Sequence, residues 1–114
     1  MTDLTTLVQD ISKAETHMVT MQHQYEQEKL KVLLEEAATR EILRAKEAKL
    51  TVQALEDKAT LDQGVQEARR KLLDCKLSYE LSKVHYESAV NNFAAARKDA
   101  TLQAAKISLG IETA

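Results

Sequence analysis

The sequence predicts an all-α protein, a long antiparallel helical hairpin that assembles with further copies into a coiled-coil or helical-bundle homo-oligomer. Three observations support this prediction. The 114 residues include no proline and only two glycines, so few positions can interrupt a helix. Aromatic residues make up 4% of the chain and charged residues 30%, which is typical of long helices rather than sheets. Apolar residues recur at alternating steps of three and four, the spacing of a coiled-coil seam.

The first predicted helix covers about residues 4–60. Its apolar seam is regular up to Tyr25, where the charged residues Glu28 and Lys29 take the next positions. Because no glycine or proline lies between residues 1 and 63, this slip predicts a stutter within one continuous helix. The first register comprises Leu4, Leu7, Ile11, Ala14, Met18, Met21 and Tyr25, and the second comprises Leu34, Ala38, Glu41, Ala45, Ala48, Val52, Leu55 and Ala59.

A turn is predicted near residues 60–64. Thr60 and Gln63 have the spacing of a capping box, Asp62 is a second candidate N-cap, and Gly64 follows. A single unbroken rod is the alternative, because one glycine inside a helix costs only about 1 kcal/mol relative to alanine.

The second predicted helix covers about residues 64–108, and Gly110 is expected to stop it before a frayed tail over residues 109–114. Its seam is the most regular in the chain. That seam comprises Val65, Ala68, Leu72, Cys75, Tyr79, Ser82, Tyr86, Ala89, Phe93, Ala96, Ala100 and Ile107. A second stripe beside it, wide enough to contact another helix, comprises Leu73, Leu77, Leu81, Val84, Ala95, Leu102, Ala105 and Leu109.

The two predicted helices differ in length, and together they form one domain over residues 1–114. Folded back at residue 62, the shorter helix leaves Leu4–Met18 as an overhang without a partner in its own chain. A two-helix hairpin also has little core of its own. Both arguments predict association with a second copy or with another protein. The predicted oligomer or partner interface comprises Leu4, Leu7, Ile11, Met18, Met21, Tyr79, Tyr86 and Phe93.

Basic residues form the best candidate for a nucleic-acid contact, although acidic residues are interleaved with them and the formal net charge is −2. The candidate patch comprises Arg40, Arg44, Lys46, Lys49, Arg69, Arg70 and Lys71.

Little in the sequence suggests catalysis, and no cofactor or metal is expected. His17, His23 and His85 lack the spacing of metal ligands. Cys75 occupies a seam position, where a cysteine usually serves as a small apolar side chain. We therefore expect no enzyme; a catalytic helical bundle would require a metal.

The expected function is a non-enzymatic helical interaction or assembly protein, such as a scaffold, an adaptor or a small chaperone-like factor. An accessory nucleic-acid-binding protein is the alternative. No secretory signal or membrane span is expected from the sequence, and a single cysteine offers no internal disulfide, so we expect a cytoplasmic protein without membrane partners.

Overall fold

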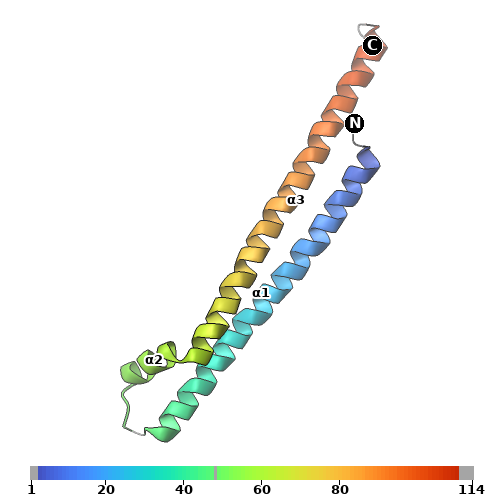
Figure 1. Ribbon diagram of the computed structural model, residues 1–114. Helices are drawn as coiled ribbons and strands as arrows, with labels where there is room; N and C mark the ends of the chain where they lie inside the picture. Colours follow the sequence, from blue (N-terminus) through green and yellow to red (C-terminus); the bar gives the residue numbers. More distant parts are fainter. Residues whose placement is uncertain (1–2, 48, 111–114) are drawn as a thin grey trace. The chain divides into compact units, whose positions relative to one another are not determined.

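The computed structural model describes residues 3–47 and 49–110. Its elements are three helices, α1 (Leu4–Lys46), α2 (Val52–Leu61) and α3 (Gln63–Leu109), and the described residues include no strand (Figure 1). The predicted all-α class is therefore confirmed. The chain divides into two compact units: unit 1 joins residues up to Val19 with those from Leu81 onward, and unit 2 is Thr20–Glu80.

The first helix is shorter than predicted. It ends at Lys46, and α2 begins only at Val52, so the prediction of one helix over residues 4–60 is wrong. Thr51 caps the new helix: its backbone is extended, and its hydroxyl accepts a hydrogen bond from the Ala54 N–H at 3.1 Å. Neither glycine nor proline marks this break.

Packing explains why the chain breaks there. Leu55 and Ala59, one helical turn apart on α2, are 5% and 3% exposed. Val65, at the start of α3, is completely buried. A straight continuation of α1 could not bring α2 into this packed position, so tertiary burial outweighs the local preference for helix.

The second boundary lies within the predicted turn. Asp62 has φ −62° and ψ 135°, which ends α2, and its carboxylate accepts a hydrogen bond from the Val65 N–H at 3.1 Å. Asp62 is thus the N-cap of α3, and the unbroken rod is excluded. The capping box at Thr60 is wrong, because its hydroxyl donates to the Glu56 carbonyl within α2. Gly64 lies inside α3.

Within unit 2, α1 and α3 run antiparallel. The rings of Tyr25 and Tyr79 lie 5.9 Å apart, and the carboxylate of Glu36 accepts two hydrogen bonds from Arg69, at 2.8 and 3.0 Å. As the residue number increases along α1, the number of the residue that it contacts on α3 therefore decreases.

The predicted second register on α1 is wrong. Leu34 is 61% exposed, and Ala38, Glu41 and Ala45 are exposed as well. Ala48 lies outside the described residues. The inner face of α1 instead contains both polar and apolar residues. Its buried and half-buried positions include Glu28, Val32, Glu36, Thr39 and Leu43. Ion pairing lets a carboxylate such as that of Glu36 occupy a seam position, which hydropathy alone does not reveal.

Within unit 1, the start of α1 and the later part of α3 lie side by side and run in opposite directions (Figure 1). Leu7 is 7% exposed, so the prediction that Leu4–Met18 overhangs without a partner is wrong. The reason is the earlier end of α1: it has 43 residues against 47 in α3. From Arg97 to Gly110 every residue is exposed, so the unpartnered segment belongs to α3 instead.

The end of α3 matches the prediction. Gly110 has φ +68°, the left-handed conformation that favours glycine, and its N–H donates to the Ile107 carbonyl at 3.1 Å. The rest of the predicted tail, residues 111–114, lies outside the described residues.

Candidate interaction surfaces

Most residues predicted for an oligomer or partner interface lie on the inner seams of the two units. Leu7 is buried, whereas Leu4 is 36% exposed at the start of α1. The half-buried members are Ile11, Met18, Met21, Tyr79, Tyr86 and Phe93. Because these side chains already contribute to packing within the chain, a partner could contact only their outer edges. Their role in an oligomer stays a prediction.

Aromatic and charged side chains cluster between α1 and α3 in unit 2. The ring planes of Tyr25 and Tyr79 are inclined by 32°, and the Lys29 ammonium lies 4.4 Å from the Tyr25 ring centre. Lys29 Nζ also lies 3.4 Å from Glu26 Oε1. Desolvation lowers the pKa of Lys29, but the charges and hydrogen bonds of Glu26 and Tyr25 outweigh it, so the pKa is raised above its ordinary value. Lys29 is therefore a cation at neutral pH.

Large apolar side chains cover the outer faces of unit 2. On α1, Leu30, Leu33 and Leu34 are 58–62% exposed. On α3, Leu73 and Leu77 are 65% and 60% exposed, as the predicted second stripe requires. Exposed apolar side chains gathered in this way mark surfaces that associate with other molecules.

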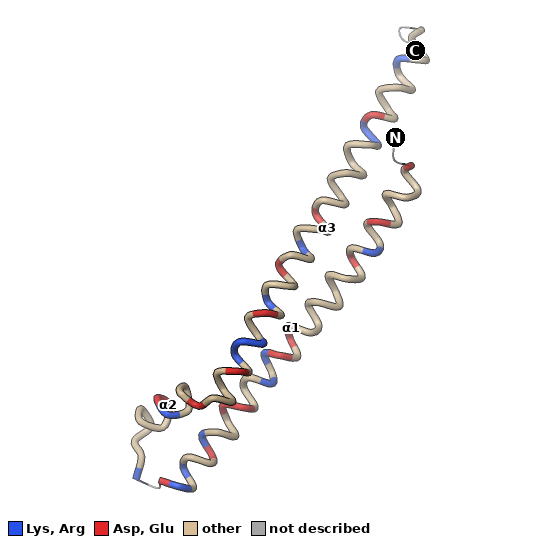
Figure 2. The backbone as a smooth tube through the Cα atoms, in the orientation of Figure 1, with Lys and Arg blue, Asp and Glu red and all other residues tan. Residues whose placement is uncertain are grey.

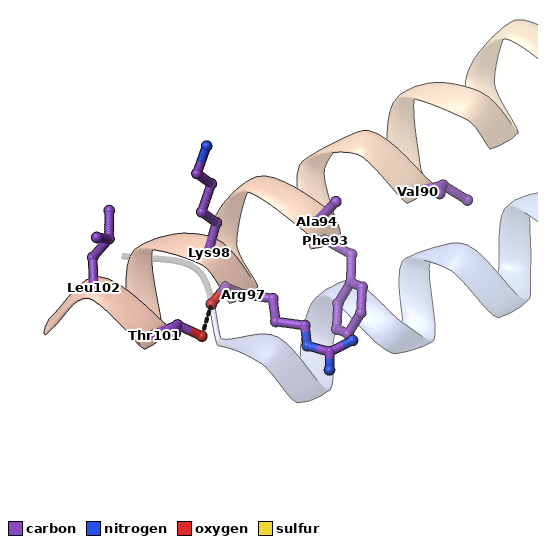
Figure 3. A pocket seen from close by; sticks show the side chains of 7 residues that line it. All are labelled: Val90, Phe93, Ala94, Arg97, Lys98, Thr101 and Leu102. Atoms are coloured by element: carbon purple, nitrogen blue, oxygen red, sulfur yellow. Dashed lines mark hydrogen bonds between the residues drawn. The ribbon is translucent and has the colours of Figure 1, made fainter. Parts of the chain in front are cut away.

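A groove in unit 1 has an apolar floor and basic residues along it. Figure 3 shows Phe93 and Arg97 pointing towards the first turns of α1, whereas Lys98 and Leu102 point away from it. The Thr101 hydroxyl donates a hydrogen bond to the Arg97 carbonyl at 3.0 Å. The lining residues are Val90, Phe93, Ala94, Arg97, Lys98, Thr101 and Leu102.

The groove leads into the unpartnered end of α3, which we call the α3 extension (residues 97–109). Its large apolar side chains are Leu102, Ile107 and Leu109, which are 50%, 69% and 71% exposed. Sequence reasoning placed the overhang on the wrong helix. The sequence contained a signal for this extension, because the second apolar stripe of α3 continues through Leu102 and Leu109.

The candidate nucleic-acid patch lies in unit 2, where carboxylates neutralise part of it. Figure 2 shows basic and acidic residues intermingled along the helices rather than separated. Three of the seven basic residues form ion pairs: Arg40–Glu56 (3.6 Å), Arg44–Glu41 (2.9 Å) and Arg69–Glu36 (2.8 Å). The other four, which form no ion pair with any described residue, are Lys46, Lys49, Arg70 and Lys71. A phosphate would have to compete with the existing carboxylates for the arginines.

A second groove, in unit 2, forms where α1 and α3 approach each other at Gly64. A methyl group on Gly64 would lie 2.7 Å from Glu35 Oε1, so the missing side chain makes room for this carboxylate. Charges of both signs line the groove, among them Glu28, Lys31 and Lys71. This mixture selects neither an anionic nor a cationic ligand.

The described residues contain no group of three or more histidine, cysteine or acidic side chains that could hold a metal ion. His17 and His85 are exposed, and His23 shares a 3.2 Å hydrogen bond with Gln27 on the next turn. Cys75 is a free, half-buried thiol on the seam of α3.

Among the described residues, no helix is both long and apolar enough to cross a membrane. No family model, curated protein or solved structure matches this chain.

Proposed function

We propose that this chain is a non-enzymatic helical interaction or assembly protein, a scaffold, adaptor or small chaperone-like factor. It acts through the coiled-coil surface of a homo-oligomer in which each copy forms a long helical hairpin. A cytoplasmic setting belongs to the same proposal, because one cysteine offers no disulfide framework.

The imbalance between buried and exposed apolar side chains supports this proposal most directly. Five hydrophobic residues of the described chain are buried, whereas seventeen large hydrophobic residues are at least 36% exposed. Fully burying a leucine or isoleucine side chain contributes about 1.5–3 kcal/mol, so much of the available apolar free energy is unused in a single copy. Association of helical faces would recover part of it, as in a helical bundle.

The charge pattern favours association between proteins over nucleic-acid binding. Three arginines of the candidate patch already have carboxylate partners, and the whole chain carries a net charge of −2. Without a continuous basic track, counterion release offers little affinity for a phosphate backbone.

Two leucines on the outer face of α1 provide a direct test. We expect the full chain to sediment as a dimer or larger assembly. The L30Q/L34Q variant should have a larger dissociation constant, so that it is already monomeric at concentrations at which the wild type is still associated. Glutamine keeps the helix propensity of leucine, so helicity should persist. A matched control is L61Q, which makes the same change at a leucine that is 79% exposed at the end of α2. A wild-type chain that is a folded monomer at every concentration would refute the proposal.

A further inference from the structure

The α3 extension differs in charge from the helix segment beside which it ends. Residues 97–109 carry three basic side chains and one acidic side chain, a net charge of +2. Residues 3–19, which comprise Asp3 and the first part of α1, carry three acidic side chains and one basic side chain, a net charge of −2. All eight of these acidic and basic side chains are exposed. The two segments of unit 1 therefore have complementary charges.

Within one copy, only Arg97, at the start of the extension, points towards α1, so Lys98 and Lys106 cannot use this complementarity. The extension continues past the position where α1 begins, and all its residues are exposed. A second copy turned end for end would place its own α1 beside the extension. Because α1 and α3 run in opposite directions within unit 1, the extension and the α1 of this second copy would run parallel.

The spacing of the charges fits this parallel arrangement. Lys98 and Lys106 are eight residues apart, about 12 Å along a helix, and Asp3 and Asp10 are seven residues apart, about 10.5 Å. With Lys98 beside Asp3, Lys106 reaches the level of Asp10.

Apolar surface is available on both sides of such a contact. The extension presents Leu102, Ile107 and Leu109, and the receiving unit presents Val8 on α1, which is 50% exposed, and Val90 at its groove, which is 36% exposed. By contrast, two extensions packed on each other would bring together two segments of charge +2. Charge therefore favours binding of the extension to the acidic start of α1 in the second copy over binding to the second copy's extension.

We propose that the α3 extension docks on unit 1 of a second copy of this chain, where its lysines face Asp3, which precedes α1, and Asp10 of α1, and its apolar side chains enter the groove at Val90. The two copies exchange extensions, so each unit 1 gains a third helix. This inference rests on the proposed function: it names the partner as a second copy and adds a contact on unit 1 to the unit 2 face that L30Q/L34Q tests.

Sedimentation equilibrium of the full chain tests the charge contact through a double-mutant cycle. K106E and D10K should each raise the dimer dissociation constant about three- to tenfold, because each replaces an attraction by a repulsion. The double variant K106E/D10K, which exchanges the two charges, should return to within about twofold of the wild type. The control K49E makes the same charge change as K106E on a residue of unit 2 and should leave the constant unchanged.

A second variant tests the apolar contact. L102Q/I107Q alters only side chains that are exposed in one copy, and glutamine favours helix, so circular dichroism should show undiminished helicity. We expect its dimer to weaken at least about 100-fold.

The outcomes separate this inference from the proposed function. A dimer that none of these variants weakens assembles through another face, which overturns the inference and leaves the proposed function standing. The same holds if the single charge variants weaken the dimer but the double variant does not recover. A wild-type chain that remains monomeric at high micromolar concentration overturns both.

Discussion

Replacing Leu55 by alanine tests the packing of α2, the element that separates the structure from a simple two-helix chain. Leu55 is 5% exposed, whereas Val52, three residues earlier on the same helix, is 79% exposed. Leucine-to-alanine substitutions in protein cores cost about 2–5 kcal/mol. We expect L55A to lose about 2–3 kcal/mol of unfolding free energy, in the lower part of that range, because a ten-residue helix can settle into part of the cavity. The matched variant V52A should change stability by less than about 0.5 kcal/mol.

Urea unfolding followed by far-ultraviolet circular dichroism measures both variants at one protein concentration, with the oligomeric state checked for each. If L55A and V52A had equally small effects, Leu55 would not be packed as the structure shows, and α2 would not be held against its neighbours in unit 2.

Three further predictions concern the cap, the ion pair and the basic patch. T51A should lose about 1 kcal/mol of stability in urea unfolding, since the Ala54 N–H loses its acceptor, whereas T60A should cost less because its hydroxyl bonds within the helix. A double-mutant cycle between E36Q and R69M should give a coupling of about 0.5–1 kcal/mol, because the Arg69 side chain is 41% exposed and screened by solvent; zero coupling would contradict its role in pairing α1 with α3. In a gel-shift assay at low salt, we expect no retardation of DNA or RNA, and a salt-dependent shift would instead favour the nucleic-acid alternative.

The helical class and the end of α3 could be predicted from the sequence because each depends on local preferences. The absence of proline leaves few positions that could end a helix, and Gly110 can adopt a left-handed conformation that other residues avoid. The regular seam of α3 was likewise visible as apolar spacing, and its positions from Val65 to Ala96 are buried or half-buried.

The break after Lys46 could not be predicted in the same way. Residues 47–51 include no glycine or proline, and the cap at Thr51 lacks the acidic partner of a capping box. The break follows from where Leu55 and Ala59 find buried positions, which depends on the whole of unit 2. One error then produced another: a first helix drawn too long placed the overhang at Leu4–Met18 instead of at the end of α3.

Hydropathy also misled the assignment of the inner face of α1. It moved the seam away from Glu28 towards Leu34, yet Glu36 and Thr39 occupy inner positions and Leu34 is exposed. A carboxylate can lie on a seam when an arginine such as Arg69 meets it, and that arginine is 33 residues away in sequence. Leu30, Leu33 and Leu34 therefore lie on the outer face of α1, which the proposed assembly uses.

Sedimentation equilibrium of the full-length chain over a wide concentration range, with helicity recorded on the same samples, tests the central claim most directly. The proposed assembly predicts a dimer or larger species whose mass falls towards that of one chain on dilution. A fully helical monomer that persists up to high micromolar concentration would contradict it.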